Sequence, residues 1–86
     1  MFIYKKDLKP YYNIIDIRDE EEYKKGHIYN AINIPVDKLL NNVGFYLNKN
    51  EKYYIYCARG YTSKKCSLIL NTLGYNIVNV VDGYEK

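Results

Sequence analysis

Short apolar runs alternate along this chain with segments whose apolar residues recur at helical spacing. An apolar run of four or five residues between polar ones predicts a strand that is covered on both faces. Apolar residues three and four positions apart predict an amphipathic helix. We therefore expect strands at residues 2–4, 13–17, 32–34, 53–56 and 77–81, and helices within residues 19–26, 36–47 and 62–73.

The helix expected within residues 19–26 has the clearest end signals. Asp19 can cap its first turn, and Glu22 three positions later completes a capping-box pattern. Gly26 follows the lysines of the last turn and predicts the end of the helix. For the helix at 62–73, the predicted buried stripe is Cys66, Ile69, Leu70 and Leu73.

The order of these elements predicts the fold class. Strands that alternate with short helices indicate an α/β fold, a small doubly wound parallel sheet of about five short strands with helices on both faces. Right-handed crossovers place the loops after Ile17 and after Tyr56 at the same edge of this sheet. Ligands of such proteins bind at the carboxyl ends of the strands. The residues that follow these two strands are therefore the candidates for a functional site.

The composition narrows the classes of protein and partner. Eighty-six residues are expected to form a single domain, and 48% apolar with 27% charged residues indicates a globular one. The net charge of +3 includes no long basic run, which argues against a nucleic-acid partner. Because no apolar stretch reaches the ~18 residues of a membrane span and residues 1–10 lack a signal-peptide core, we expect a cytoplasmic protein without a membrane partner. The two cysteines are then expected to be free thiols.

Cys57 is the residue that points most directly to chemistry. It follows the apolar run 53–56 and precedes the helix at 62–73, so the sequence predicts a thiol at the bend between a strand and a helix. Backbone N–H groups of a tight loop and the positive end of a helix both stabilise a thiolate, the reactive form of cysteine. The alternative interpretation is a small apolar residue that closes the strand.

Two motifs of this chain are specific enough to compare with known families. The first is segment 53–65 around Cys57. The second lies upstream and consists of residues 16–18 (DIR), 22–23 (EY), 26–28 (GHI) and 31–35 (AINIP). The first resembles the active-site loop, and the second the upstream sequence pattern, of rhodanese-like sulfurtransferases. A third and weaker piece, residues 74–83, resembles the closing strand and glycine turn of the family. The resemblance covers residues 12–84, and it implies that residues 1–86 form a single minimal domain of this kind.

The resemblance also implies a reaction. Cys57 would take a sulfane sulfur as a persulfide and pass it to a thiophilic acceptor. The substrate-binding loop around it would consist of Ala58, Arg59, Gly60, Tyr61, Thr62 and Ser63. Main-chain N–H groups of this loop would face the sulfur, with Gly60 allowing a tight turn. Arg59 would help to bind an anionic donor, and Thr62 and Ser63 would cap the next helix.

The implied partners are small sulfur compounds and a sulfur acceptor. The donor would be thiosulfate or a polysulfide, and the acceptor a thiol or a sulfur-trafficking protein; no cofactor and no metal ion are implied. Many members of the family carry arginine where this chain has Thr62, and phosphatases and arsenate reductases require arginine where it has Ser63. Because an oxyanion needs that bidentate guanidinium, the sequence disfavours phosphatase and arsenate-reductase activity. The same change weakens the expectation for thiosulfate more than for persulfide chemistry.

Three further residues are candidates for supporting roles. Asp16 and Arg18 end the strand beside the expected site, and the resemblance implies that they organise the region around the cysteine loop. Asp16 is expected to accept hydrogen bonds from loop N–H groups. For Arg18, the alternative is an ion pair with Glu22 in the next helix. His27 lies in the turn of the G-H-I motif, which implies structural support rather than a catalytic pair with Cys57.

Cys66 and the end of the chain leave alternatives open. Cys66 is either a buried core cysteine or a resolving thiol that forms a disulfide with Cys57. The leading hypothesis is a thiosulfate sulfurtransferase of the rhodanese type. Its rivals are a non-catalytic rhodanese-like module that docks a partner peptide, and a thiol redox protein that uses both cysteines. Since family members often continue beyond the point where Lys86 ends this sequence, we expect one face of the sheet to be thinly covered and open to self-association or a partner.

Overall fold

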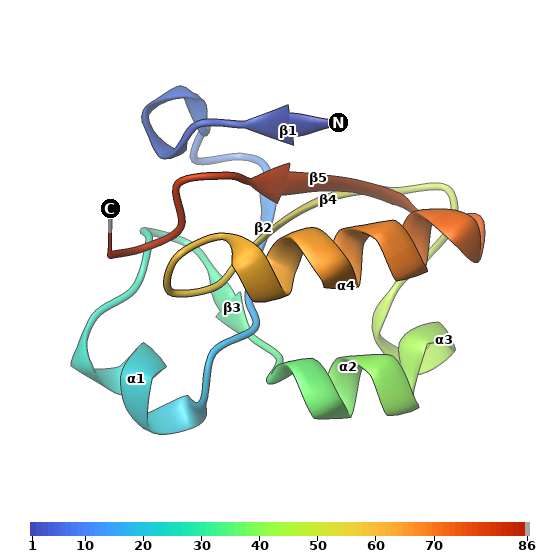
Figure 1. The fold of residues 1–86 in the computed structure, drawn as a ribbon, viewed down its shortest axis with the longest axis horizontal. Helices are drawn as coiled ribbons and strands as arrows, with labels where there is room; N and C mark the ends of the chain where they lie inside the picture. The colour runs from blue at the N-terminus through green and yellow to red at the C-terminus, as the bar shows by residue number, and fades with distance from the viewer. Residues whose placement is uncertain (86) are drawn as a thin grey trace.

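The computed structural model describes residues 1–85, which form a five-stranded parallel sheet with helices packed against it (Figure 1). The strands are β1 (Phe2–Ile3), β2 (Asn13–Asp16), β3 (Ile32–Asn33), β4 (Lys52–Tyr56) and β5 (Asn76–Val80). The helices are the 3-10 turn η1 (Lys5–Asp7), α1 (Glu20–Lys25), α2 (Val36–Asn41), α3 (Val43–Tyr46) and α4 (Tyr61–Thr72). The predicted α/β class and the parallel sheet of short strands are confirmed.

The strand order places two loops side by side at the centre of the sheet. The order is β1-β5-β4-β2-β3. From β2 the chain goes to β3 at one edge of the sheet. It then crosses back to β4 on the other side of β2 and continues to β5, next to the opposite edge. In the central pair, Asp16 at the end of β2 lies opposite Tyr56 at the end of β4. Where the winding direction reverses between neighbouring parallel strands, the loops diverge and leave room for a ligand. The loops after Ile17 and after Tyr56 begin at this point, as expected.

The central strands bury side chains on both faces of the sheet. One core cluster holds Ile15, Ile55 and Ile77, whereas the other holds their neighbours in the chain, Ile14, Tyr54 and Val78. Because successive residues of a strand point to opposite faces, a strand buried on both reads as a continuous apolar run. This arrangement explains why these strands could be located from the sequence.

The two faces are covered by different parts of the chain. Residues of α2, α3 and α4 close the first core cluster, for example Leu39, Val43 and Leu70. The second cluster is closed by Ile3, Leu8, Tyr12, Ile28 and Tyr84. Within residues 1–85, no residue of an α-helix belongs to this second cluster, so strand-edge and loop residues provide its cover.

The prediction of a single helix within residues 36–47 is wrong, because the segment forms two helices, α2 and α3, that meet at Asn42. The backbone of Asn42 leaves the helical region at φ −144°, and its side-chain Nδ2 donates to the Lys38 carbonyl. A side-chain amide that bonds to the backbone competes with the helical hydrogen bond, and Gly44 adds weak helix propensity. Both helices still pack against the first core cluster.

The buried side of α4 also differs from the predicted stripe. Cys66 and Leu70 are buried as expected, but Ile69 and Leu73 are 47% and 51% exposed. The buried positions of the helix are Ser63, Cys66, Ser67 and Leu70. These positions share the three- and four-residue spacing of one helix face. Because serine is polar, a search for apolar residues at helical spacing does not find the two buried serines. Their small side chains lie where α4 packs against β5.

The start of α1 lacks the predicted capping box. Asp19 is the N-cap residue by position, but it forms no side-chain capping hydrogen bond. The helix has no buried residue, so water can accept its first N–H groups. Gly26 follows the last residue of the helix, as expected.

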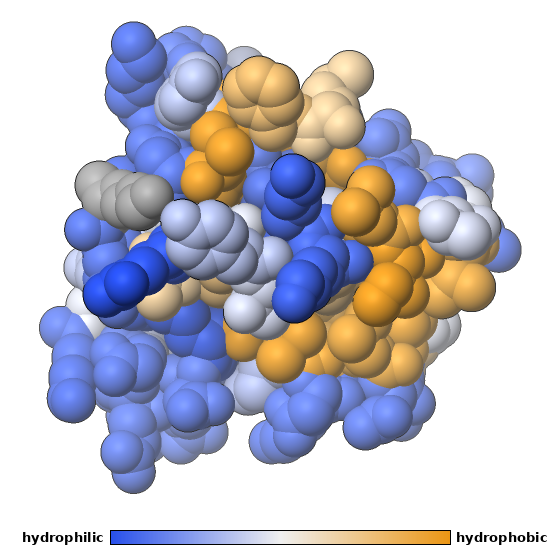
Figure 2. Space-filling model, viewed as in Figure 1, coloured by the Kyte–Doolittle hydropathy of each residue, from blue (hydrophilic) through white to orange (hydrophobic). Residues whose placement is uncertain are grey.

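Some apolar side chains face outward. Leu68 and Ile69 of α4 and Leu73 directly after it are exposed, and hydrophobic residues gather toward the right of the view in Figure 2. No helix in residues 1–85 combines the length and the apolar character that a membrane span requires.

Candidate active site

Cys57 lies at the carboxyl edge of the sheet, directly after β4 and beside the end of β2. The Ile17 N–H donates to the Tyr56 carbonyl over 3.0 Å and joins the two strand ends. The Cys57 side chain is 7% exposed and belongs to the first core cluster. It also borders a cavity of about 210 Å³ that is lined by Ala58, Arg59, Tyr61 and Thr62. Cys57 therefore packs against the core on one side and borders a cavity on the other.

Two backbone N–H groups of the loop point at the Cys57 sulfur. The nitrogens of Gly60 and Ser63 lie 3.2 Å and 3.3 Å from Sγ. The hydroxyl oxygen of Ser63 lies 3.4 Å from the same atom. Because the fold fixes the two N–H groups before any reaction, they can stabilise negative charge on the sulfur without reorganising. The loop thus curls around the sulfur in the manner that the sequence led us to expect.

Gly60 allows the loop to close. Its φ is +94°, in the left-handed region, and an added Cβ would lie 2.1 Å from the Val81 carbonyl oxygen. Both the backbone angle and the space exclude a side chain at this position. The N–H of Gly60 reaches the sulfur because no larger residue holds the loop away.

The sulfur takes the place of a capping side chain for α4. The N-cap residue is Gly60, and the helix has no side-chain capping hydrogen bond. Ser63 is the third residue of the helix, whose N–H a capping oxygen normally accepts. Here that N–H points at Cys57 Sγ. The prediction that Thr62 and Ser63 cap α4 is wrong, because both lie inside the first turn, where their own N–H groups need acceptors.

A second glycine turn supports the cysteine loop. The Tyr84 N–H donates to the Cys57 carbonyl and the Glu85 N–H to the Ala58 carbonyl, each over 2.9 Å. Gly83 has a φ of +64°, and a Cβ on it would lie 2.5 Å from the Ala58 carbonyl oxygen. The closing turn of the chain therefore holds the cysteine loop in place, a role that the sequence did not reveal.

The remaining loop residues lie at the rim of the cavity. Arg59, Tyr61 and Thr62 are exposed. Arg59 is the basic residue of the loop 58–63, so a cation is available at the mouth of the cavity rather than beside the sulfur. Among residues 1–85, the hydrogen-bond partners of Cys57 Sγ are Gly60 and Ser63.

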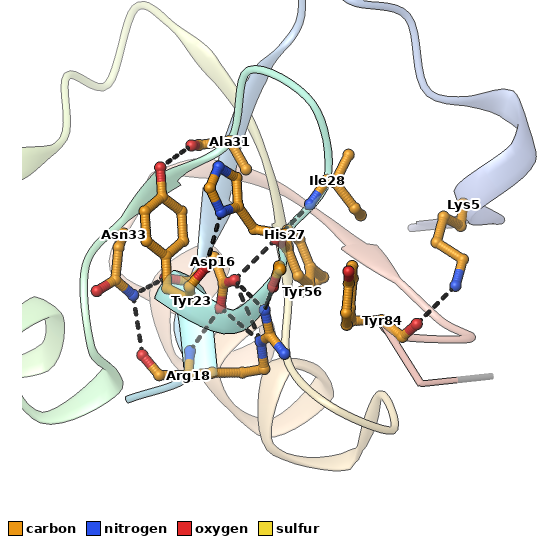
Figure 3. Close-up of polar contacts among 11 residues, drawn as sticks. Lys5, Asp16, Arg18, Tyr23, His27, Ile28, Ala31, Asn33, Tyr56 and Tyr84 are labelled. Carbon is orange, nitrogen blue, oxygen red and sulfur yellow. Dashed lines mark hydrogen bonds and ion pairs between the residues drawn. The ribbon is translucent and has the colours of Figure 1, made fainter. Parts of the chain in front are cut away.

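A buried polar network joins the ends of β2 and β4 on the opposite face of the sheet (Figure 3). Asp16 is fully buried, and its Oδ2 accepts hydrogen bonds from Arg18 Nη2 at 2.7 Å and from the Tyr56 hydroxyl at 2.8 Å. Its Oδ1 accepts the backbone N–H of Arg18 at 2.9 Å. Asp16 thus accepts the N–H of its own loop and, among residues 1–85, no N–H of the cysteine loop 58–63, so the expected bonds to the cysteine loop are wrong. The alternative ion pair between Arg18 and Glu22 is wrong, because Asp16 binds the guanidinium.

Arg18 extends this network to the end of α1 and to the closing turn. Its Nη2 donates to the Gly26 carbonyl over 2.6 Å, and its Cζ lies 4.3 Å from the centroid of the Tyr84 ring (Figure 3). The hydrogen bonds to Asp16 raise the pKa of Arg18, against the effect of burial. Burial, and after it the bond to Asp16, raises the pKa of Tyr56. Arg18 is therefore held as a charged group that positions loops and does not touch the sulfur.

Cys66 has the surroundings of a core residue. It is 1% exposed and lies in the first core cluster. Burial, and after it the charge of Cys57, raises the pKa of Cys66 to about 11. Both cysteines are free thiols in the structure. A thiol with so high a pKa is a weak nucleophile near neutral pH, which favours the core interpretation over that of a resolving thiol.

His27 is engaged in local structure. Its Nδ1 lies 2.8 Å from the Tyr23 carbonyl oxygen, and its ring stacks on the Tyr23 ring with centroids 3.7 Å apart (Figure 3). These contacts fix the turn after α1, in agreement with the structural role that the sequence implied.

Asn79 belongs to the site, although the sequence did not single it out. It lies in β5, is 4% exposed, and accepts a hydrogen bond from the Ser63 hydroxyl through its Oδ1. A signal was present, because Asn79 interrupts the apolar run 77–81 at a position that the sheet buries. A buried polar side chain requires a partner, and here Ser63 provides it.

Sequence comparisons identify relatives of this chain. The rhodanese-like domain family matches residues 3–86. The putative sulfur carrier protein YrkF of Bacillus subtilis is 37% identical over 75 residues, and the thiosulfate sulfurtransferase PspE of Escherichia coli is 33% identical over 72 residues. Each alignment covers 83% of this chain. The chain spans 38% of the length of YrkF and 69% of the length of PspE.

Solved structures share the fold. A rhodanese-like domain protein from Staphylococcus aureus has a TM-score of 0.76 and 43% identity, covering 90% of this chain and 74% of that one. A protein from Staphylococcus saprophyticus has a TM-score of 0.78 and 38% identity, covering 84% of this chain and 71% of that one. Sequence and structure comparisons therefore lead to the same family.

Proposed function

Because the chain belongs to the rhodanese-like domain family, we propose that it is a sulfurtransferase that carries sulfane sulfur as a persulfide on Cys57. The observation that carries this proposal is the position of the Gly60 and Ser63 N–H groups, which meet the Cys57 sulfur at the start of α4. A packing cysteine needs no such donors, whereas a sulfur anion does. Relatives named as a sulfur carrier and as a thiosulfate sulfurtransferase support the reaction class.

The first half-reaction is a displacement at sulfur. The Cys57 thiolate attacks the sulfane sulfur of thiosulfate, and a new S–S bond forms as the bond to the sulfonate sulfur breaks. The electron pair of the broken bond leaves with sulfite, so the exchange requires no external oxidant or reductant. With a polysulfide, the leaving group is the shortened polysulfide anion. In both cases the enzyme keeps a persulfide anion within reach of the loop N–H groups.

The second half-reaction returns the enzyme to its starting form. An acceptor thiolate, or cyanide in an assay, attacks the outer sulfur, and Cys57 leaves as a thiolate. A leaving thiolate that is stabilised departs faster, so the N–H groups that favour attack also favour release. The acceptor is a small thiol or a sulfur-trafficking protein. We propose a cytoplasmic location, where thiols stay reduced.

The loop favours a polysulfide over thiosulfate as the donor. Thiosulfate ends in a sulfonate group, which is bound best by a guanidinium or several N–H groups. The loop supplies Arg59 at the exposed rim, while an exposed threonine, Thr62, stands where a second arginine could have served. A polysulfide has no sulfonate to bind. We therefore expect both donors to load Cys57, the polysulfide at lower concentration.

Intact mass spectrometry under nonreducing conditions tests the proposal. The wild type, Cys57→Ser and the control Cys66→Ala are incubated with each donor. We expect a gain of about 32 Da, reversed by reductant, in the wild type and in Cys66→Ala but not in Cys57→Ser. No adduct with either donor contradicts the proposal and favours a binding module. A loss of about 2 Da that requires both cysteines contradicts it in favour of a Cys57–Cys66 disulfide.

A further inference from the structure

Asn79 and Ser63 form a buried polar pair behind the Cys57 sulfur. Ser63 is 0% exposed and Asn79 is 4% exposed. The Ser63 hydroxyl oxygen and Asn79 Oδ1 lie 2.5 Å apart. The two residues come from α4 and β5, which pack against each other, so the core fixes the position of this pair.

The Ser63 hydroxyl has a single hydrogen and three acceptors near it. Asn79 Oδ1 lies at 2.5 Å, the Gly60 carbonyl oxygen at 3.3 Å and Cys57 Sγ at 3.4 Å. The nearest oxygen takes the hydrogen, because hydrogen bonds weaken with distance and oxygen accepts better than sulfur. Ser63 then presents a lone pair to Cys57, and the hydrogen bond between these two residues is donated by the thiol.

We infer that Asn79 is a positioning residue that holds the Ser63 hydroxyl hydrogen away from Cys57, so that the protein offers a thiolate at this position two backbone donors and not three. When Cys57 loses its proton, it can no longer donate a hydrogen bond to Ser63. The thiolate then faces a lone pair of the Ser63 hydroxyl, and its hydrogen-bond donors are the two backbone N–H groups. For the hydroxyl to become a third donor, Ser63 must give up its bond to Asn79. The inference rests on the proposed function in taking Cys57 as the reactive thiol.

The surroundings of Asn79 make the inference testable by substitution. Asn79 also borders a cavity of about 340 Å³, whose walls include Phe2, Leu68 and Val81. Leucine has the same branch at Cγ as asparagine but can neither accept nor donate a hydrogen bond. Asn79→Leu therefore removes the acceptor, and its methyl groups find apolar neighbours in the cavity.

The pH dependence of Cys57 alkylation by iodoacetamide is the test. Trypsin separates the two thiols, because Cys57 falls in the peptide 53–59 and Cys66 in the peptide that begins at residue 66. We expect Asn79→Leu to lower the pH of half-maximal alkylation by about one unit. The Gly60 carbonyl oxygen at 3.3 Å and Cys57 Sγ at 3.4 Å then compete for the freed hydrogen, and a charged thiolate accepts a stronger hydrogen bond than a neutral carbonyl, so the hydroxyl becomes a third donor to it. In a Ser63→Ala background, the same substitution should cause no further shift, since its effect acts through that hydroxyl.

The controls separate positioning from a general loosening of the core. Ser67 donates to the Ser63 carbonyl from the next turn of α4, so Ser67→Ala disturbs the same helix face and should leave the pH midpoint unchanged. If circular dichroism shows that Asn79→Leu does not fold, Asn79→Val, which suits a strand, replaces it.

Two results overturn the inference: an unchanged or raised midpoint in Asn79→Leu, and a shift that persists without the Ser63 hydroxyl. Alkylation needs no sulfur donor. A failure of this inference is therefore distinguishable from a failure of the proposed sulfur transfer, which the mass of the donor-treated protein reports separately.

Discussion

Replacing Gly60 with alanine tests whether the sulfur cradle depends on a single backbone position. The φ of Gly60 is +94°, and an added Cβ would lie 2.1 Å from the Val81 carbonyl oxygen. A Cβ in the left-handed region costs about 1–2 kcal/mol, and crowding in a packed interior adds about 1–3 kcal/mol. The crowding atom is backbone that follows β5, so the loop itself has to shift. We expect a total loss of about 2–5 kcal/mol in the free energy of unfolding.

Gly74→Ala is the matched control for this substitution. Gly74 has a similar φ of +98°, but its added Cβ would meet the flexible end of Lys49, 3.5 Å from Nζ. It lies at the far end of α4, a 12-residue helix and therefore roughly 18 Å from the cysteine loop. This variant should lose the strain energy alone, about 1–2 kcal/mol, and form the persulfide at the wild-type rate.

Thermal unfolding followed by circular dichroism and persulfide formation followed by mass spectrometry measure the two effects. In a domain of this size, 1 kcal/mol lowers Tm by about 4–8 °C, so Gly60→Ala should melt at least about 4 °C below Gly74→Ala. Because the shifted loop withdraws an N–H donor from the sulfur, the rate of persulfide formation should fall at least about tenfold. Equal melting temperatures together with a wild-type rate in Gly60→Ala would refute this reasoning.

Three further predictions concern residues around the loop. Arg18→Met should cost about 3–5 kcal/mol in urea unfolding, because it leaves the Asp16 carboxylate buried without its partner; a loss below about 1 kcal/mol would contradict the assigned role. Burial raises the pKa of Cys66 from 9.0 to about 11, so the stability gained from its protonated form is present below pH 9 and lost as the pH rises toward 11. Cys66→Ala should therefore flatten the fall in stability across this interval, and a fall as steep as in the wild type would count against the assignment. Arg59→Ala should raise KM for thiosulfate more than for a polysulfide, and equal changes in steady-state assays would show that Arg59 does not bind the sulfonate.

The strands could be predicted because burial on both faces leaves a direct mark on the sequence. The runs at 53–56 and 77–81 contain few polar residues, and the observed strands end within a residue of the predicted limits. Helix details were less predictable because they depend on single side chains. The amide of Asn42 ends α2, and two buried serines replace Ile69 and Leu73 on the packed side of α4.

The part of the site that is formed by residues close together in the sequence could be predicted. The position of Cys57 and the need for Gly60 follow from a strand, a tight loop and a helix in sequence. The partners of Arg18 depend instead on which strands are neighbours, because Asp16 and Tyr56 meet across the pair β2–β4. Asn79 reaches Ser63 because α4 packs against β5. The spacing of apolar residues within one helix or strand does not reveal which element packs beside it. These contacts could therefore be identified only from the structure.

The position of the Cys57 sulfur connects the proposed chemistry to the stability of the fold. The Ser63 N–H that would stabilise a sulfur anion is also the N–H that a helix needs to have capped, and Sγ accepts it in the resting state. Cys57 also borders the cavity of about 210 Å³ at the rim of the loop, which offers space for the outer sulfur of the proposed persulfide. If the inner sulfur keeps its place, loading does not require the first turn of α4 to open. The proposed chemistry is therefore compatible with a loop that stays folded in both states.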